Sequence, residues 1–197
     1  FLIFILRTQI VRVVLGVGQF GWLDTRLTAA CLGVFSLGLL GQALILIFSK
    51  TFYAVHNTKI PAVVSVATVI LNIVMSFLFV WLLSSYGAFH AFVQYLLKLQ
   101  GIEDIRIAGL ALAFAITMVL EALVLLVLLH KKIKNLASKG IVTSLYKILI
   151  ASLAMSLVVF WVRQSLVEYS ILNLETFWGV FWQLVVSLAA GIIFYIV

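Results

Sequence analysis

Five long apolar runs, separated by short polar segments, dominate this chain of 197 residues. They cover residues 27–49, 61–83, 107–129, 144–162 and 177–197. A bilayer's hydrocarbon core, about 30 Å thick, needs roughly 20 apolar residues in each crossing helix. None of the runs shows the alternating pattern of barrel strands. Because a backbone in lipid must satisfy its polar groups within each segment, the runs predict an all-α, polytopic transmembrane helical bundle.

The composition agrees with a membrane protein. Hydrophobic residues make up 65% of the chain and charged residues 10%, and the mean hydropathy is +1.30, values outside the range of soluble domains. A sixth apolar piece, residues 1–15, carries Arg7 and Arg12, has no clean signal-peptide pattern and looks like the end of a cut helix. The last run ends at Val197 without a polar flank. We therefore expect a fragment of a larger transporter-like protein.

The basic residues predict the orientation, because cytoplasmic loops retain lysine and arginine. One side holds lysines and no acids: Lys50, Lys59, Lys131, Lys132, Lys134, Lys139 and Lys147. The other side mixes Arg12, Arg26, Lys98, Arg106 and Arg163 with Asp24, Glu103, Asp104, Glu168 and Glu175. We expect the loops 50–60 and 130–147 in the cytoplasm. The net charge of +7 is thus split between two faces, which favours membrane lipids over nucleic acid as partners.

The segment 84–106 is too short and too polar for another crossing. Its apolar residues recur near helical spacing, which predicts an interfacial helix with Tyr86, Tyr95 and Lys98 at headgroup level. This helix either caps the bundle or gates an outward cavity.

Polar residues follow one face of two predicted spans. Ser65, Thr68, Asn72 and Ser76 are spaced by three, four and four, and Gly109, Ala113, Thr117 and Glu121 by four. Such spacing places each set on one helix face, and small residues let helices approach closely. On the last span Gln183, Ser187 and Gly191 repeat in the same way, which favours a seam toward a neighbouring helix, or a groove for a lipid tail.

Glu121 is the one acid deep in a predicted span, and such a group is a functional candidate. It could couple transport to protons or sodium, with Thr68, Asn72, Ser76 and Thr117 as further transport candidates. The alternative is structural: a hydrogen-bonded glutamate, like intramembrane Asn and Ser, can simply join two helices.

No catalytic pattern is present. The chain has no HExxH, P-loop or GxSxG motif, and its three histidines are scattered. The lone Cys31 excludes an internal disulfide and a cysteine-built metal site. We therefore expect no enzyme, no metal and no bound cofactor.

Several motifs resemble one known family. They are Val14–Phe20 with Gly18 and Phe20, then Asp24-Thr25, Thr28-Ala29-Ala30, Phe52-Tyr53-Ala54, Thr58-Lys59-Ile60-Pro61, and Ile107–Ala113 with Gly109. In letters, order and spacing they closely resemble the carboxy-terminal lobe of the lipid II flippases called MurJ or MviN. The motif residues are expected to be structural.

The resemblance implies a fourteen-helix transporter of the multidrug, oligosaccharidyl-lipid and polysaccharide exporter superfamily, with two six-helix lobes and two extra helices. By order, this chain resembles the end of helix nine and helices ten to fourteen. Residues 1–130 would then belong to the carboxy-terminal lobe, with the interfacial segment at 84–106, and residues 131–197 would form the two additional helices. The family places the hinge around residues 51–61 in the cytoplasm, in agreement with the lysines.

The implied function is the translocation of lipid II, the undecaprenyl-diphosphate-linked peptidoglycan precursor, from the inner to the outer leaflet of the bacterial cytoplasmic (inner) membrane by alternating access. A missing amino-terminal lobe of the same chain would supply much of the cavity. The alternatives are another lipid-linked oligosaccharide or multidrug exporter of the superfamily, or a non-transporting membrane scaffold.

The chain also departs from the family pattern. His56-Asn57-Thr58 stands where Asp-Thr is usual, Glu121 stands where Asn is common, and Ser76 replaces a carboxylate thought to help bind sodium. In the hinge, Pro61 can start a helix that Thr58 caps. Alternatively, Lys50 and Lys59 attract the anionic headgroup at a cytoplasmic gate.

Overall fold

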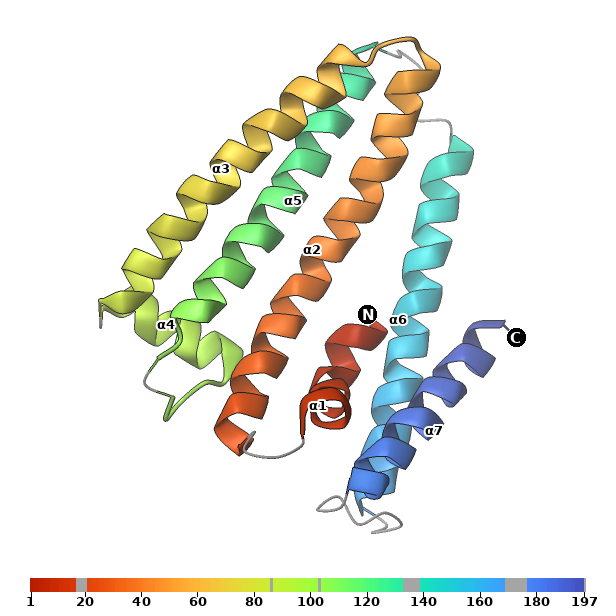
Figure 1. The fold of residues 1–197 in the computed structure, drawn as a ribbon. Coiled ribbons are helices and arrows are strands. Elements are labelled where there is room, and N and C mark those ends of the chain that lie inside the picture. The colour runs from red at the N-terminus through yellow and green to blue at the C-terminus, as the bar shows by residue number, and fades with distance from the viewer. Residues whose placement is uncertain (17–20, 86, 103, 133–138, 169–176, 197) are drawn as a thin grey trace. The chain divides into compact units, whose positions relative to one another are not determined.

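A computed structural model of the chain describes residues 1–16, 21–85, 87–102, 104–132, 139–168 and 177–196 (Figure 1). The described residues form helices and no strand. The helices are α1 (Leu2–Leu15), α2 (Trp22–Ala54), α3 (Lys59–Ser84), α4 (Ala88–Leu97), α5 (Arg106–Lys132), α6 (Lys139–Glu168) and α7 (Phe177–Ile196). The all-α prediction is confirmed.

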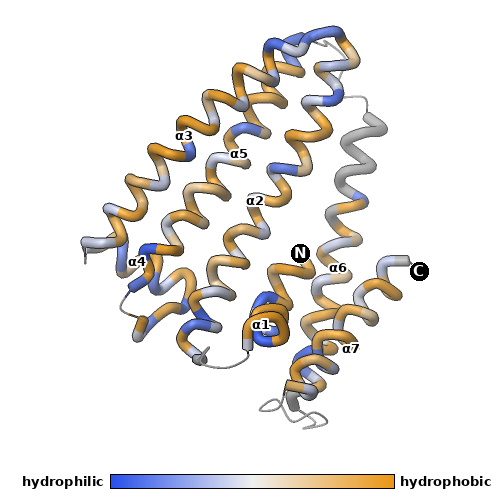
Figure 2. The backbone as a smooth tube through the Cα atoms, viewed as in Figure 1, coloured by the Kyte–Doolittle hydropathy of each residue, from blue (hydrophilic) through white to orange (hydrophobic). Residues whose placement is uncertain are grey.

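Four of the described helices are long and apolar enough to cross a membrane: α2, α3, α5 and α7 over Phe177–Tyr195. The fifth predicted span, 144–162, lies within α6, which is apolar over Ile150–Leu166. Figure 2 shows apolar residues along most of these helices and hydrophilic residues gathered at the turn between α2 and α3. The chain thus has the helices of a multi-pass membrane protein.

The helices divide into two compact units, residues 30–136 and residues 1–29 with 137–197. We call them the central unit and the terminal unit. The first residues of α2 belong to the terminal unit and the rest of α2 to the central unit. The predicted division after residue 130 concerns the lobes of a whole flippase and stays a prediction.

In the central unit, α5 packs against both α3 and α2 (Figure 1). On the α2 side, the rings of Phe35 and Phe114 meet edge to face with centroids 5.3 Å apart. Toward the end of α2, Phe52 is fully buried against Leu125 and Leu129. These apolar contacts hold the helices where the polar side chains of α3 and α5 meet.

Helix α4 lies in the segment predicted to hold an interfacial helix. It packs against α3, where the rings of Phe79 and Phe89 stack with centroids 5.8 Å apart. Val93 is buried, whereas Phe92 and Tyr95 on the same helix are exposed. This division between faces is that of an amphipathic helix. Its position at a membrane interface stays a prediction, and Tyr86 and Glu103 lie outside the described residues.

In the terminal unit, α7 packs against α6 and α1. Gln183, Ser187 and Gly191 on α7 are all buried. A Cβ added at Gly191 would lie 2.6 Å from the Val159 side chain of α6, so only glycine permits this close approach. The repeated face of the last span therefore faces a neighbouring helix, as the spacing predicts.

Candidate functional site

The predicted polar faces of α3 and α5 lie against each other. All four residues of the α5 series, Gly109, Ala113, Thr117 and Glu121, are buried. A Cβ added at Gly109 would lie 3.1 Å from the backbone carbonyl carbon of Phe79, so the glycine lets the two backbones approach closely. This approach brings side chains of α3 within hydrogen-bonding distance of α5.

Glu121 is joined to α3 by a hydrogen bond. The hydroxyl of Ser65 donates to Oε1 of Glu121 at 2.7 Å, and the glutamate side chain is nearly buried, with 5% exposed. Among the described residues, no lysine, arginine or histidine forms an ion pair with this carboxyl group, and its Oε2 has no hydrogen-bond partner. The group is therefore a carboxyl between two helices, and its second oxygen can accept a further hydrogen bond.

A second polar pair lies nearer to the start of α5. The amide nitrogen of Asn72 donates to Oγ1 of Thr117 at 2.8 Å. The Thr117 hydroxyl in turn donates to the carbonyl of Ala113, 2.8 Å away and four residues earlier, as is common for threonine in a helix. The pair therefore links the backbone of α5 to a side chain of α3.

The two remaining candidates of the α3 stripe have other surroundings. Thr68 is buried, and its hydroxyl donates to the carbonyl of Val64 in its own helix at 2.9 Å. Ser76 is half-buried on α3. Neither hydroxyl is bonded to α5 in the described part of the chain. The structure thus brings together Ser65 with Glu121 and Asn72 with Thr117, but not the whole stripe.

No metal site accompanies these residues. The described residues contain no group of three or more His, Cys, Asp or Glu side chains that could hold a metal ion. The two hydrogen bonds between α3 and α5 hold these helices together, and we call this polar contact the seam.

The hinge is shorter than the sequence pattern indicates. Phe52, Tyr53 and Ala54 belong to the last turn of α2, where burial of Phe52 keeps the chain helical, and Tyr53 is exposed. The turn itself follows, with His56 in a left-handed conformation at φ 53°. The Phe-Tyr-Ala motif thus anchors the end of α2 to the core of the central unit.

The cap of α3 differs from the prediction. Thr58 occupies the position before the helix, but its side chain makes no capping hydrogen bond. Instead, Oδ1 of Asn57 accepts a hydrogen bond from the backbone N–H of Ile60 at 3.3 Å. Pro61 is buried in the first turn of α3, where its missing N–H leaves no bond unmade. The assignment of the cap to Thr58 is therefore wrong, and the neighbouring asparagine does this work.

The Asp-Thr motif closes the first turn of α2. Asp24 Oδ2 accepts a hydrogen bond from the backbone N–H of Gly21 at 2.9 Å, and the Thr25 hydroxyl donates to the carbonyl of Gly21 at 3.0 Å. A carboxylate three residues into a helix that reaches back to the cap is half of a capping box. The motif is structural here, whereas Gly18 and Phe20 lie outside the described residues.

Lys50 and Lys59 are exposed near the two helix ends that flank the hinge. In the described part of the chain, the acid–base pair within salt-bridge distance is Arg106 with Asp104, so neither lysine is held by a carboxylate. Of the other lysines predicted on that side, Lys134 and the side chain of Lys139 lie outside the described part of the chain. On the opposite side, the same holds for Glu175 and the side chain of Glu168.

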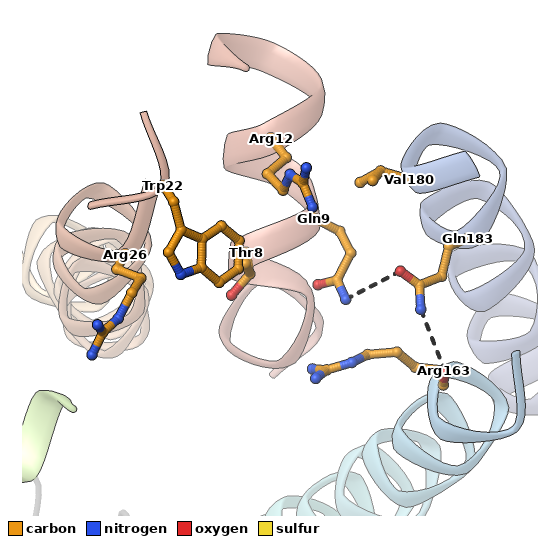
Figure 3. Close-up of a pocket in the computed structure, with 8 residues that line it drawn as sticks. All are labelled: Thr8, Gln9, Arg12, Trp22, Arg26, Arg163, Val180 and Gln183. Atoms are coloured by element: carbon orange, nitrogen blue, oxygen red, sulfur yellow. Dashed lines mark hydrogen bonds between the residues drawn. The ribbon is translucent and has the colours of Figure 1, made fainter. Parts of the chain in front are cut away.

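The sequence did not predict a cavity of about 400 Å³ within the terminal unit (Figure 3). Its polar lining comes from α1, α2, α6 and α7 and consists of Thr8, Gln9, Arg12, Arg26, Arg163 and Gln183. Trp22 and Val180 complete the described wall. We call this cavity the arginine pocket.

Comparison with known proteins shows what the chain is similar to. Residues 1–88 match the family model described as Lipid II flippase MurJ. This segment is therefore similar to the MurJ family. A curated relative, "Probable lipid II flippase MurJ" from Buchnera aphidicola subsp. Acyrthosiphon pisum (strain APS), is 28% identical over 156 residues, which cover 75% of this chain and 30% of the relative. No solved structure matches the chain with statistical significance.

The MurJ match confirms the resemblance inferred from the sequence motifs. It includes the Asp-Thr and Phe-Tyr-Ala motifs and the Ser65 and Asn72 side of the seam, whereas Thr117 and Glu121 lie beyond residue 88. The chain spans 30% of the length of the MurJ relative, so the activity of a whole MurJ protein is a matter for proposal.

Proposed function

We propose that this chain is part of a flippase that moves lipid II from the inner to the outer leaflet of a bacterial inner membrane by alternating access. The observation that carries the proposal is the MurJ match over residues 1–88. The four long apolar helices support a multi-pass membrane location. An amino-terminal lobe of the same protein, which the resemblance implies, belongs to the proposal as the other wall of the headgroup cavity.

The seam between α3 and α5 supplies a place for ion coupling. Alternating access requires helices with two arrangements, and an ion biases them only if it binds one arrangement better. The Ser65–Glu121 bond crosses between two helices in apolar surroundings, where adding a proton to the carboxyl changes the charge between them. We assign proton coupling to Glu121; sodium coupling is the other outcome of the test.

The hinge lysines have a separate role in the proposal. Lys50 and Lys59 are exposed, and a positive charge beside a membrane attracts anionic headgroups by about 1 kcal/mol per residue. We place the loops 50–60 and 130–147 in the cytoplasm, so that these lysines gather the diphosphate headgroup before it enters the cavity. This work is transport, without covalent chemistry on the substrate.

The test is rescue of cells depleted of their own lipid II flippase by the full-length gene product. We expect growth and outer-leaflet lipid II, measured by labelling of intact cells, to be restored. Rescue of growth without outer-leaflet lipid II, or no rescue by a protein present in the membrane at normal abundance, would contradict the flippase proposal. It would favour another lipid-linked oligosaccharide or multidrug exporter, or a scaffold.

The coupling role is tested separately with Glu121→Gln, which keeps the shape of the side chain and can still accept the bond from Ser65. We expect at least a tenfold loss of flipping at equal abundance, and loss of its dependence on the proton gradient. Asp104→Asn removes an exposed carboxylate outside the helix and serves as the control. Full activity of Glu121→Gln would show that Glu121 takes no part in the mechanism. If flipping depended on the sodium gradient alone, sodium would be the coupling ion.

A further inference from the structure

The amide groups in the arginine pocket have an orientation fixed by one backbone carbonyl. The carbonyl of Arg163 can only accept, so Gln183 presents its Nε2 to it, at 3.4 Å. The Oε1 of Gln183 is then left to accept from Nε2 of Gln9, at 3.5 Å (Figure 3). This chain of bonds requires Gln9 to keep its own Oε1 for another partner.

That oxygen has no partner among the described residues. Gln9 is 93% buried, with 7% exposed, and its Oε1 makes no hydrogen bond. In Figure 3 the oxygen points away from Gln183, toward the part of the pocket where Thr8 and Trp22 lie. A buried acceptor without a donor costs about 1–3 kcal/mol. The pocket therefore favours a ligand that brings a hydrogen-bond donor, such as a hydroxyl group.

The same pocket is strongly basic. Three arginines line it, and no carboxylate is among the described lining residues. The guanidinium of Arg12 lies over the ring of Trp22, 5.5 Å from the centroid, and Nη1 of Arg163 donates to the carbonyl of Ile5 at 3.2 Å. These contacts position two of the cations. Arginine forks match the oxygen geometry of phosphate groups, so the fitting ligand carries phosphate as well as hydroxyl.

The location of the pocket selects the source of that phosphate. Helices α2 and α7 are candidate membrane spans, and both contribute residues from their first two turns, Trp22 and Arg26 on one and Val180 and Gln183 on the other. The start of a spanning helix lies near the lipid headgroups, where tryptophan is enriched. A volume of about 400 Å³ is within the range of small-molecule sites.

We propose that the arginine pocket binds the headgroup of an anionic phospholipid whose phosphodiester carries hydroxyl groups, as phosphatidylglycerol does. The arginines hold the phosphate oxygens, and a glycerol hydroxyl donates to Oε1 of Gln9. The occupant is a resident lipid of the bilayer, and the proposal does not depend on transport of lipid II.

Native mass spectrometry of the delipidated full-length protein in detergent tests this assignment. The probes are dioleoyl-phosphatidylglycerol, dioleoyl-phosphatidylmethanol, which has the same charge and no hydroxyl, and dioleoyl-phosphatidylcholine, which has no net charge. We expect one phosphatidylglycerol molecule to bind tightly. The affinity for phosphatidylmethanol should be about three- to tenfold lower, as for the loss of one hydrogen bond, and the affinity for phosphatidylcholine should be lower still. Soluble sn-glycerol 3-phosphate and inorganic phosphate separate a headgroup from a free anion.

Two variants and a control tie the binding to this pocket. Arg26→Gln and Arg163→Gln should each lower the affinity for phosphatidylglycerol by about tenfold, as expected for the loss of a charge-assisted hydrogen bond. Lys98→Gln removes one exposed positive charge elsewhere and should change binding by less than about twofold. Because Arg163 also bonds Ile5, Arg26→Gln, at a half-buried position, keeps the test valid if the Arg163 variant fails to fold.

Several results would overturn the assignment. If phosphatidylcholine bound as tightly as phosphatidylglycerol, the pocket would not select an anion. If phosphatidylmethanol bound as tightly, the hydrogen bond from a lipid hydroxyl to Gln9 would be contradicted. Binding of sn-glycerol 3-phosphate as tight as that of the lipid would assign a soluble ligand. Losses of equal size in Arg26→Gln and Lys98→Gln would show general surface attraction and no site.

Discussion

Asn72 on α3 donates a hydrogen bond of 2.8 Å to Thr117 on α5, across two helices that are each long and apolar enough to span a membrane. The Ser65–Glu121 hydrogen bond is 2.7 Å long and joins the same faces of the two helices. Two polar links between one pair of apolar helices favour one register of the pair, because sliding would leave polar groups unpaired in lipid.

The first prediction concerns the coupling energy of that pair. In a double-mutant cycle of Asn72→Ala and Thr117→Val, we expect a coupling of about 0.6 kcal/mol and no more than about 1.7 kcal/mol, the range found for hydrogen bonds between membrane helices. Reversible unfolding of the purified protein in detergent measures it. As a control, Asn72→Ala with Ser152→Ala, on another helix, should be additive. A coupling near zero would show that the bond does not stabilise the fold.

The second prediction follows from the close approach at Gly109. A Cβ there would lie 3.1 Å from the Phe79 carbonyl carbon, so Gly109→Ala forces the helices apart slightly, and Gly109→Leu forces them apart further. We expect graded losses of unfolding free energy within about 1–3 kcal/mol, the range for overpacking. Leu110→Phe enlarges the exposed neighbouring side chain and should be nearly neutral. Equal stability of all three variants would refute close packing at this point.

How far the sequence predicts this fold depends on the kind of feature. The spans are predictable because the bilayer sets a minimum apolar length, and the described residues of all five predicted runs lie within helices. Their ends are less predictable, since a helix continues past the hydrocarbon when tertiary contacts stabilise it. Burial of Phe52 against Leu125 and Leu129 does this for α2, so the hinge is shorter than its polar composition indicates.

The candidate site divides in the same way. Helical spacing places Asn72 on one face of α3 and Thr117 on one face of α5, but the packing of the two helices, close at Gly109, decides which residues meet. The pairing partners therefore required the structure. Helical spacing could not predict the arginine pocket, because Gln9 and Gln183 are separated by most of the chain. Arginines and a tryptophan at one predicted membrane boundary were its signal in the sequence.

The third prediction is a titration at the start of α5. Hydrogen bonds from the side chain and then the backbone of Arg106 lower the pKa of Asp104 to about 2, against an ordinary value of about 3.9. Because the folded pKa is lowered, the contribution of this exposed pair to stability is complete above about pH 4 and is lost as the pH falls through about 2.

Carbon-13 NMR of the Asp104 carboxyl group in the purified protein measures this midpoint directly. In Arg106→Gln the midpoint should rise toward the ordinary value. Lys98→Gln, which removes a cation from the segment that precedes Asp104, should leave the midpoint near 2. A midpoint near 4 in the unaltered protein would contradict the ion pair seen in the structure.

The last prediction separates the two residues that precede α3. Since Oδ1 of Asn57 accepts from the N–H of Ile60 and the Thr58 side chain caps nothing, Asn57→Ala should lower the unfolding free energy by about 0.5–2 kcal/mol. Thr58→Ala should change it by less than about 0.5 kcal/mol. Asn57→Asp preserves the acceptor and should retain most of the stability. A larger loss from Thr58→Ala than from Asn57→Ala, measured by unfolding in detergent, would return the cap to the threonine.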